Sequence, residues 1–156
     1  MRQKLLAVAV LGLLAAGACT DSSTPSGPSA ALTVNGNWQT DVSVAGQSAR
    51  MTWVLTQSGT AVSGPVTVAL QNGIVLMNGT LAGTVSGATA TSASLTYTLS
   101  VVAGGIPTQP ACSGQFGGSM TATAGTPATM TGDFSLKSAT CTPPSFTSGS
   151  LTLTKQ

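Results

Sequence analysis

The sequence predicts an all-β fold, and three observations lead to this prediction. From Leu32 onward, apolar and polar residues alternate with a period of two, which is typical of strands with one buried face. No segment after that point shows the 3.6-residue apolar stripe of an amphipathic helix. Turn signals rich in Gly, Asn, Ser and Pro separate the alternating segments at short intervals. The chain is therefore expected to form a series of strands joined mainly by short loops.

The first half of this region contains three alternating segments and one glycine-rich segment. The alternating segments are residues 36–44, 51–56 and 62–70. Asn72-Gly73 follows them as a hairpin signal, because both residues tolerate the positive φ that tight hairpin turns require. Residues 74–87 then carry a glycine at every fourth position from Gly79. Glycines inside strands mark bends or close backbone approach, so we expect a strongly curved sheet in this segment.

The second half continues the alternation to the end of the chain. Leu95, Tyr97, Leu99 and Val101 give its clearest example, and a loop follows at residues 103–110. Further strands are expected around residues 112–122 and 130–136 and at Leu151 and Leu153, separated by turns at residues 124–127 and 142–145. The count is eight or nine strands.

Short connections between successive strands favour an antiparallel up-and-down meander. A meander of this size either closes into a barrel or leaves two long edges open to aggregation, so we expect a closed barrel of 8–9 strands. A barrel of eight strands is either filled by its own side chains or holds one small ligand. A two-sheet β-sandwich is the alternative, because the alternation alone does not reveal crossovers between sheets.

The N-terminal segment has the features of a secretory signal. Arg2 and Lys4 precede an apolar run at residues 5–14, and residues 16–18 are the small side chains that a signal peptidase requires. The run is too short to cross a bilayer as a helix. Cys19 follows directly, and together these features resemble the signal and lipobox of bacterial lipoproteins. The resemblance implies that Cys19 is the lipid attachment site, through which the protein contacts a membrane.

These features divide the chain into three parts. Residues 1–18 are the expected signal peptide, 19–33 the lipidated cysteine with a flexible tether, and 34–156 a single β-barrel domain. A tether of this length has a root-mean-square span of about 20 Å, which would keep the domain close to the membrane surface. Thr20 rather than Asp follows the cysteine, and the resemblance then implies the outer membrane of a bacterial cell envelope.

The composition argues against several functions. After residue 18 the chain keeps three basic and three acidic side chains, so no basic patch for nucleic acid is expected. The chain contains no His, and its three acidic residues are all Asp. These absences argue against catalytic triads, His-based metal sites and the usual carboxylate pair of glycosidases. We therefore expect a protein that is not an enzyme and has no metal site and no cofactor.

A second resemblance rests on Gly36-Asn37-Trp38 at the start of the first strand. A Gly-x-Trp in this position resembles the opening motif of the lipocalin and calycin group of β-barrels. In that group the Trp closes one barrel end and a basic side chain from late in the chain packs across it. By this resemblance Gly36, Trp38 and Lys155 form a structural barrel end, with a cation–π contact between lysine and indole.

Two cysteines remain once Cys19 is assigned to the lipid. An even pair in a secreted chain predicts one disulfide, in this chain Cys112 with Cys141. This pairing centres a hairpin between residues 126 and 127, inside an expected turn. In strict register, however, Cys112 and Phe116 lie on the face opposite that of Phe134 and Leu136. We expect a β-bulge at residues 117–118, two glycines, to restore the phase.

Two functions fit this sequence. The first is a lipid-anchored envelope lipoprotein whose non-catalytic barrel is a structural or interaction module for another envelope protein. The alternative is lipocalin-like binding of a small apolar ligand inside the barrel. An apolar cavity of about 300 Å³ or more would favour binding. A filled interior would favour the structural module.

Overall fold

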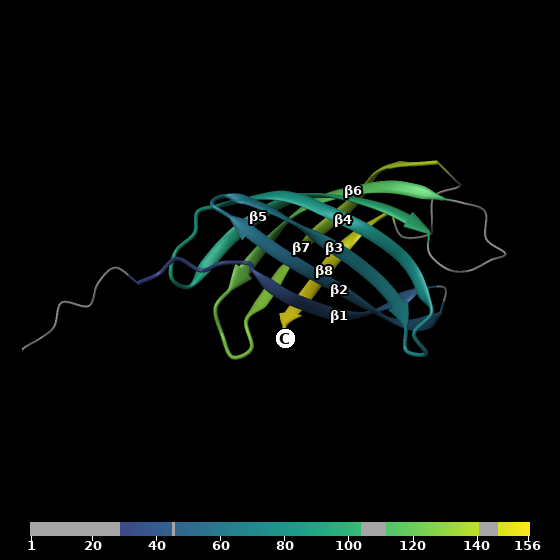
Figure 1. Ribbon diagram of the computed structural model, residues 1–156, viewed down its shortest axis with the longest axis horizontal. Helices are drawn as coiled ribbons and strands as arrows, with labels where there is room; N and C mark the ends of the chain where they lie inside the picture. The colour runs from purple at the N-terminus through teal and green to yellow at the C-terminus, as the bar shows by residue number, and fades with distance from the viewer. Residues whose placement is uncertain (1–28, 45, 104–111, 141–146) are drawn as a thin grey trace, which may run out of the picture.

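Eight antiparallel strands form the fold of this protein. We describe it from a computed structural model, which places residues 29–44, 46–103, 112–140 and 147–156. The strands are β1 (Gly36–Val44), β2 (Gln47–Ser58), β3 (Ala61–Leu70), β4 (Val75–Ser86), β5 (Ser92–Ala103), β6 (Ser113–Thr123), β7 (Thr129–Ala139) and β8 (Ser148–Lys155). Each strand pairs with the next one in the sequence, and β8 pairs with β1 (Figure 1). The predicted closed meander is confirmed, and the sandwich alternative is rejected.

Among the described residues the turns follow the predicted signals with small differences in length. β2 begins at Gln47, earlier than the alternating segment at residues 51–56 suggested. At the Asn-Gly signal β3 and β4 are separated by residues 71–74, and Gly73 takes a φ of 87°. The side-chain oxygen of Asn72 accepts a hydrogen bond from the amide of Ile74 at 3.1 Å. The glycine-rich middle forms one continuous strand, β4, in which a Cβ at Gly83 would lie 2.6 Å from the carbonyl oxygen of Thr96.

Apolar side chains line the inner face of the barrel, and Ser and Thr dominate the outer face. The largest fully buried side chains are Trp38, Trp53, Leu81, Leu95, Met120, Met130, Leu153, Val34 and Val68. No polar or charged residue is buried in the part of the chain that the structure describes. Among the described residues there is no helix with the length and hydropathy needed to cross a membrane.

Trp38 closes one end of the barrel. Its side chain is fully buried, and its indole nitrogen donates a hydrogen bond of 2.8 Å to the carbonyl oxygen of Val34. The ammonium of Lys155 lies 5.5 Å from the centroid of the Trp38 ring. Gly36 has a φ of 116°, and a Cβ there would lie 3.0 Å from Cε of Lys155. The structure therefore brings Gly36, Trp38 and Lys155 together at this end.

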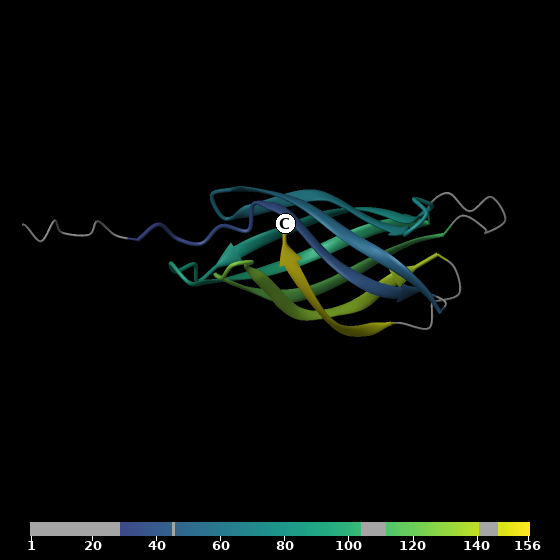
Figure 2. The same ribbon diagram turned by 90° about the horizontal axis from the view of Figure 1, so that it is seen from below.

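The seam between β1 and β8 is hydrogen-bonded over a short distance. Trp38 pairs with Lys155 and Gln39 with Thr154, and the amide of Gln156 donates to the carbonyl oxygen of Asn37 at 2.9 Å. Every other pair of neighbouring strands aligns over seven residues or more. Both views show β8 and β1 close together at the C-terminus and diverging from there (Figures 1 and 2). The barrel is thus closed along the seam only near Trp38.

The packed part of the chain begins before β1. The amide of Leu32 donates a hydrogen bond of 2.6 Å to the carbonyl oxygen of Thr89, and Leu32 packs against the core. Val34 is buried, and its amide donates to the side-chain oxygen of Gln57. Residues 1–28, which include the expected signal peptide, Cys19 and most of the expected tether, lie outside the described residues.

The register of β6 and β7 contains an irregularity, but not where the sequence suggested. Phe116 pairs with Leu136 and Gln115 with Ser138, so Lys137 is the extra residue and the bulge lies on β7. The bulge expected at residues 117–118 is therefore wrong. The irregularity nevertheless places Phe116 and Leu136 on the same inner face, because paired residues of neighbouring strands share a face.

Beyond this bulge the hydrogen bonding between the two strands continues to Ser113 and Thr140. The amide of Thr140 donates a hydrogen bond of 2.9 Å to the carbonyl oxygen of Ser113, next to Cys112. Cys112 is disulfide-bonded, and its partner is not among the described residues. Because Cys141 also lies outside them, the pairing of Cys112 with Cys141 stays a prediction.

We predict that Trp38→Ala lowers the free energy of unfolding by about 3–5 kcal/mol, because it removes a large buried side chain and leaves a cavity. Lys155→Met keeps an aliphatic stem but removes the charge, so it should lower the free energy of unfolding by about 1 kcal/mol. Val102→Ala, on the exposed outer face, is the control and should have little effect. Urea denaturation measures all three. A Trp38→Ala variant as stable as the control would show that the closed end does not support the barrel.

Candidate functional site

A cavity of about 340 Å³ lies inside the barrel, on the side of Trp53 away from the closed end. Trp53 pairs with Trp38 in the register of β1 and β2, but only Trp53 lines the cavity. The other lining side chains are mainly apolar and include Met51, Met77, Tyr97, Phe116 and Phe134. The interior of the barrel is therefore filled around Trp38 and hollow beyond Trp53.

Trp53 and Tyr97 are the central aromatic pair of the cavity wall. Their ring centroids are 5.1 Å apart in an edge-to-face arrangement, which is a favourable geometry for aromatic rings. The Tyr97 hydroxyl donates a weak hydrogen bond, 3.4 Å long, to the backbone carbonyl of Asp133. Burial, with a smaller contribution from the charge of Asp133, raises the pKa of Tyr97 to about 12. Tyr97 is therefore neutral at any physiological pH.

The indole nitrogen of Trp53 is buried and has no hydrogen-bond partner. It is the only such side-chain atom among the residues placed in the structure. Trp38 is equally buried, but its nitrogen is paired with Val34. A buried donor without an acceptor costs about 1–3 kcal/mol, so an unpaired group of this kind is rare in native structures. The unpaired donor belongs to the tryptophan that lines the cavity.

Glycines make room for a second aromatic pair in the wall. Phe116 and Phe134 meet edge to face with centroids 6.0 Å apart. Phe134 has a glycine on each side in the register, Gly118 on β6 and Gly149 on β8. A Cβ at Gly149 would lie 3.0 Å from the Phe134 ring. The ring can therefore lie over β8 beside the cavity.

The cavity opens through the diverging part of the seam. Residues 40–44 of β1 and 149–152 of β8 line it together with the interior side chains. The register of β1 with β8 ends at Gln39, so these two edges are not paired with each other. Asp41 lies at this rim and forms an exposed ion pair of 3.0 Å with Arg50. An exposed pair contributes little stability, so the rim is held mainly by β2 and β7. We call this opening the seam portal.

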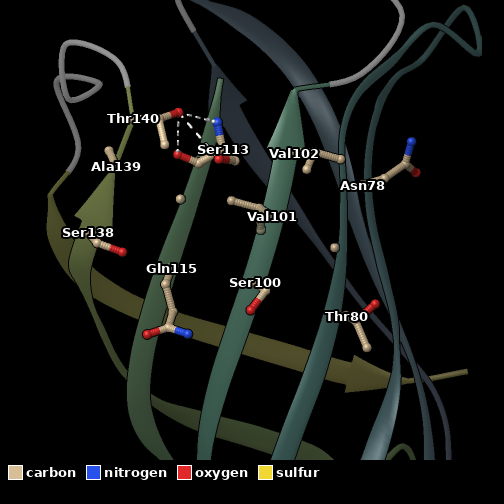
Figure 3. Close-up of a pocket in the computed structure, with 12 residues that line it drawn as sticks. Asn78, Thr80, Ser100, Val101, Val102, Ser113, Gln115, Ser138, Ala139 and Thr140 are labelled. Carbon is tan, nitrogen blue, oxygen red and sulfur yellow. Dashed lines mark hydrogen bonds between the residues drawn. The ribbon is translucent and has the colours of Figure 1, made fainter. Parts of the chain in front are cut away.

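A second hollow lies on the outer surface of β4 to β7 and measures about 560 Å³ (Figure 3). Its described lining residues include no charged and no aromatic side chain and are largely small and polar, among them Asn78, Ser100 and Gln115. At one edge Ser113 and Thr140 hydrogen-bond to each other. The hollow is broad and open to solvent, and none of its described lining residues has a buried polar group without a partner. It offers less to a ligand than the interior cavity does.

Of the predicted site residues, those that the structure describes do not line the cavity. Gly36, Trp38 and Lys155 are at the closed end, and Cys112 lies beside Ser113 at the other end of the barrel. Trp53, Tyr97 and Phe134 were not predicted as site residues, because their alternation is equally typical of a filled core. The described residues contain no group of three or more His, Cys, Asp or Glu that could hold a metal ion.

Comparison of the chain with protein-family models, curated proteins and solved structures finds no match. The closed eight-stranded up-and-down barrel is compatible with the architecture of lipocalin-type barrels. That likeness concerns the fold alone. The function must therefore be argued from the cavity, the seam portal and the sequence of the N-terminal segment.

Proposed function

We propose that this protein is a lipid-anchored lipoprotein of a bacterial cell envelope whose barrel binds a small, mainly apolar ligand. The anchor is supported by the resemblance of residues 1–19 to a lipoprotein signal, with Cys19 as the modified residue. Binding is supported by the interior cavity. The protein has no catalytic role and no cofactor in this proposal, because the chain lacks His and Glu and, of the described aspartates, Asp41 alone lines the cavity.

One observation carries the binding proposal, namely the volume and lining of the cavity. At about 340 Å³ it is larger than packing defects in protein cores and lies at the lower end of the range for ligand pockets. Its walls come mostly from apolar and aromatic side chains, as in most pockets for small molecules. The seam portal gives access from the side of the barrel. These features favour the binding function over the structural one.

The structural or interaction module is the second candidate. It is supported by the filled half of the barrel and by the broad polar hollow of Figure 3, which a partner protein could cover. This function needs no ligand inside the barrel. It predicts that the protein still binds its partner in the envelope when the cavity is sealed.

We predict that Cys19→Ser abolishes the partition of the protein into membranes and detergent. Each buried methylene of an acyl chain contributes about 0.8 kcal/mol, and the tether and neutral barrel offer no comparable affinity. Thr20→Asp is the matched control, since it keeps the lipid. By the lipoprotein resemblance it should move the protein from the outer to the inner membrane. A Cys19→Ser protein that still sediments with membranes would contradict the proposed anchor.

We predict that a disulfide across the seam portal blocks binding. Ser43 and Ser150 would face each other if the register of Trp38 with Lys155 continued along the seam. The double variant Ser43→Cys/Ser150→Cys should therefore draw the two edges together when oxidised. Uptake of the neutral dye N-phenyl-1-naphthylamine, followed by its fluorescence, should become at least about tenfold slower and recover on reduction.

The single variants Ser43→Cys and Ser150→Cys are the controls for this cross-link. Each should bind the dye as the unmodified protein does. Equal uptake by the oxidised and reduced double variant would show that ligands do not pass through the seam portal. No dye binding by the unmodified protein would count against the binding function itself.

A further inference from the structure

We propose that the seam portal binds an extended peptide segment of a partner protein as an additional strand between β1 and β8, with the apolar side chains of that segment in the cavity. This inference rests on the proposed binding function and adds the class of the ligand. In strand addition of this kind, backbone hydrogen bonds give affinity and pockets for alternate side chains give specificity.

The first step is the direction of the backbone groups of β1 at the seam. The amide of Gln156 donates to the carbonyl oxygen of Asn37, so Asn37 directs its backbone groups toward β8. Backbone groups alternate between the two neighbours of a strand, so Asp41 and Ser43 also direct theirs toward the seam. The register of β1 with β8 ends at Gln39, and no described residue pairs with these groups. β1 therefore presents the amide and the carbonyl of both residues to the opening.

The second step is the matching edge of β8. The amide of Lys155 donates to the carbonyl oxygen of Ala128, next to β7, so the alternate residues Thr152 and Ser150 direct their backbone groups toward β1. Their side chains are exposed, yet both residues line the cavity. The same holds for the two residues of β1. Strand backbone, with the hydroxyls of edge residues beside it, thus borders the opening on both sides.

The third step is the chemistry that this border requires. Each edge offers amide donors and carbonyl acceptors, and equivalent groups repeat at about 6.8 Å along a strand. An extended backbone repeats its own donors and acceptors at the same interval, whereas a single carbonyl or hydroxyl group satisfies one position. β1 and β8 are antiparallel, so an inserted strand is antiparallel to one and parallel to the other. In both orientations its inward residues bond to one edge and its outward residues to the other.

The fourth step is the space beneath the seam. Thr40, Val42 and Val44 on β1 and Leu151 on β8 have half-buried side chains that line the cavity. Every second residue of an inserted strand would point into the same mainly apolar space of about 340 Å³. This volume equals that of on the order of ten water molecules, enough for about two or three side chains such as valine and leucine. The ligand is therefore a segment in which apolar residues alternate with small polar ones.

The fifth step is the lack of the usual protection of strand edges. Lysine, proline or a bulge normally keeps an exposed edge from pairing with another chain. Residues 40–44 and 149–152 contain no lysine and no proline, and their one charge, that of Asp41, is paired with Arg50 of β2. A second copy of this barrel would pair with an edge but leave the cavity empty. A peptide strand satisfies both the edges and the cavity.

The test uses the mature chain, residues 19–156, with Cys19→Ser so that no acyl chain competes. The probe is the peptide Lys-Ser-Val-Thr-Leu-Thr-Val-Ser-Lys with acetylated and amidated ends, in which three apolar residues alternate with threonines. We expect it to displace N-phenyl-1-naphthylamine from the cavity. At saturation it should slow hydrogen exchange of the Asp41 and Ser43 amides at least about tenfold and leave that of Gly73, in a distant turn, unchanged.

Modified peptides distinguish strand addition from apolar contact alone. N-methylation of the central leucine removes a donor from an inward residue, and N-methylation of the threonine after it removes one from an outward residue. Each should weaken binding about tenfold, which corresponds to one lost hydrogen bond. N-methylation of a terminal lysine, beyond the paired core, is the control and should change the affinity less than about twofold.

Ser43→Pro is the matched change in the protein. It removes an amide that faces the seam, and proline is tolerated at such an edge position because β2 does not use this amide. The variant should bind the peptide at least about tenfold more weakly and bind the dye as the unmodified protein does. Dye binding therefore also shows that the variant is folded.

The outcomes separate this inference from the proposed function. Peptide affinity that is unaffected by N-methylation of the core would overturn strand addition and leave apolar binding standing. Dye uptake without any peptide binding would have the same consequence. No binding of either dye or peptide would overturn both. A dimer with slow exchange at Asp41 and Ser43 before peptide is added would also overturn the inference, because a second copy would then occupy the seam.

Discussion

The contact between the two ends of the chain is the constraint on which the rest of the structure depends. A meander leaves its first and last strands with free edges, and these strands must meet for a barrel to close. In this protein they meet at Trp38 and Lys155, where the lysine packs over the indole and over the space that a side chain at Gly36 would fill. Burial of the indole and its bond to Val34 fix this end. The closed seam then extends no further than Gln39.

The hydrogen-bonded part of the seam is short, and this explains why the barrel is filled around Trp38 and hollow beyond Trp53. β1 and β8 have nine and eight residues, whereas β2 to β7 have ten to twelve. Around Trp38 the large side chains of neighbouring strands converge and pack. Where β1 and β8 diverge, their inner side chains do not meet, and the aromatic rings of Trp53, Tyr97 and Phe134 border a cavity instead. A single geometric feature, the divergence of two strands, thus produces both the cavity and its access.

The fold could be predicted from the sequence because strand period and turn residues are local signals. The alternation at Leu95 to Val101 and the turn at Gly73 indicate strands regardless of their neighbours. The bulge could not be located, because the register depends on the inner residues of two strands: Phe116 and Leu136 share a face only if Lys137 is the extra residue. The cavity could not be predicted either. Trp53 has the pattern of a core residue, and only the volume enclosed beside it distinguishes a lining position from a packed one.

Hydrogen exchange along β1 and β8 tests the central claim, that the barrel is closed near Trp38 and open beyond it. If the seam is open beyond Gln39, the seam-facing amides of residues 40–44 and 148–151 exchange rapidly because they have no partner across the seam. The amides at the closed end, including that of Gln156 bonded to Asn37, exchange slowly together with the core strands. Uniform protection along the full length of both strands would contradict the claim, since the seam would then be closed and the cavity without access.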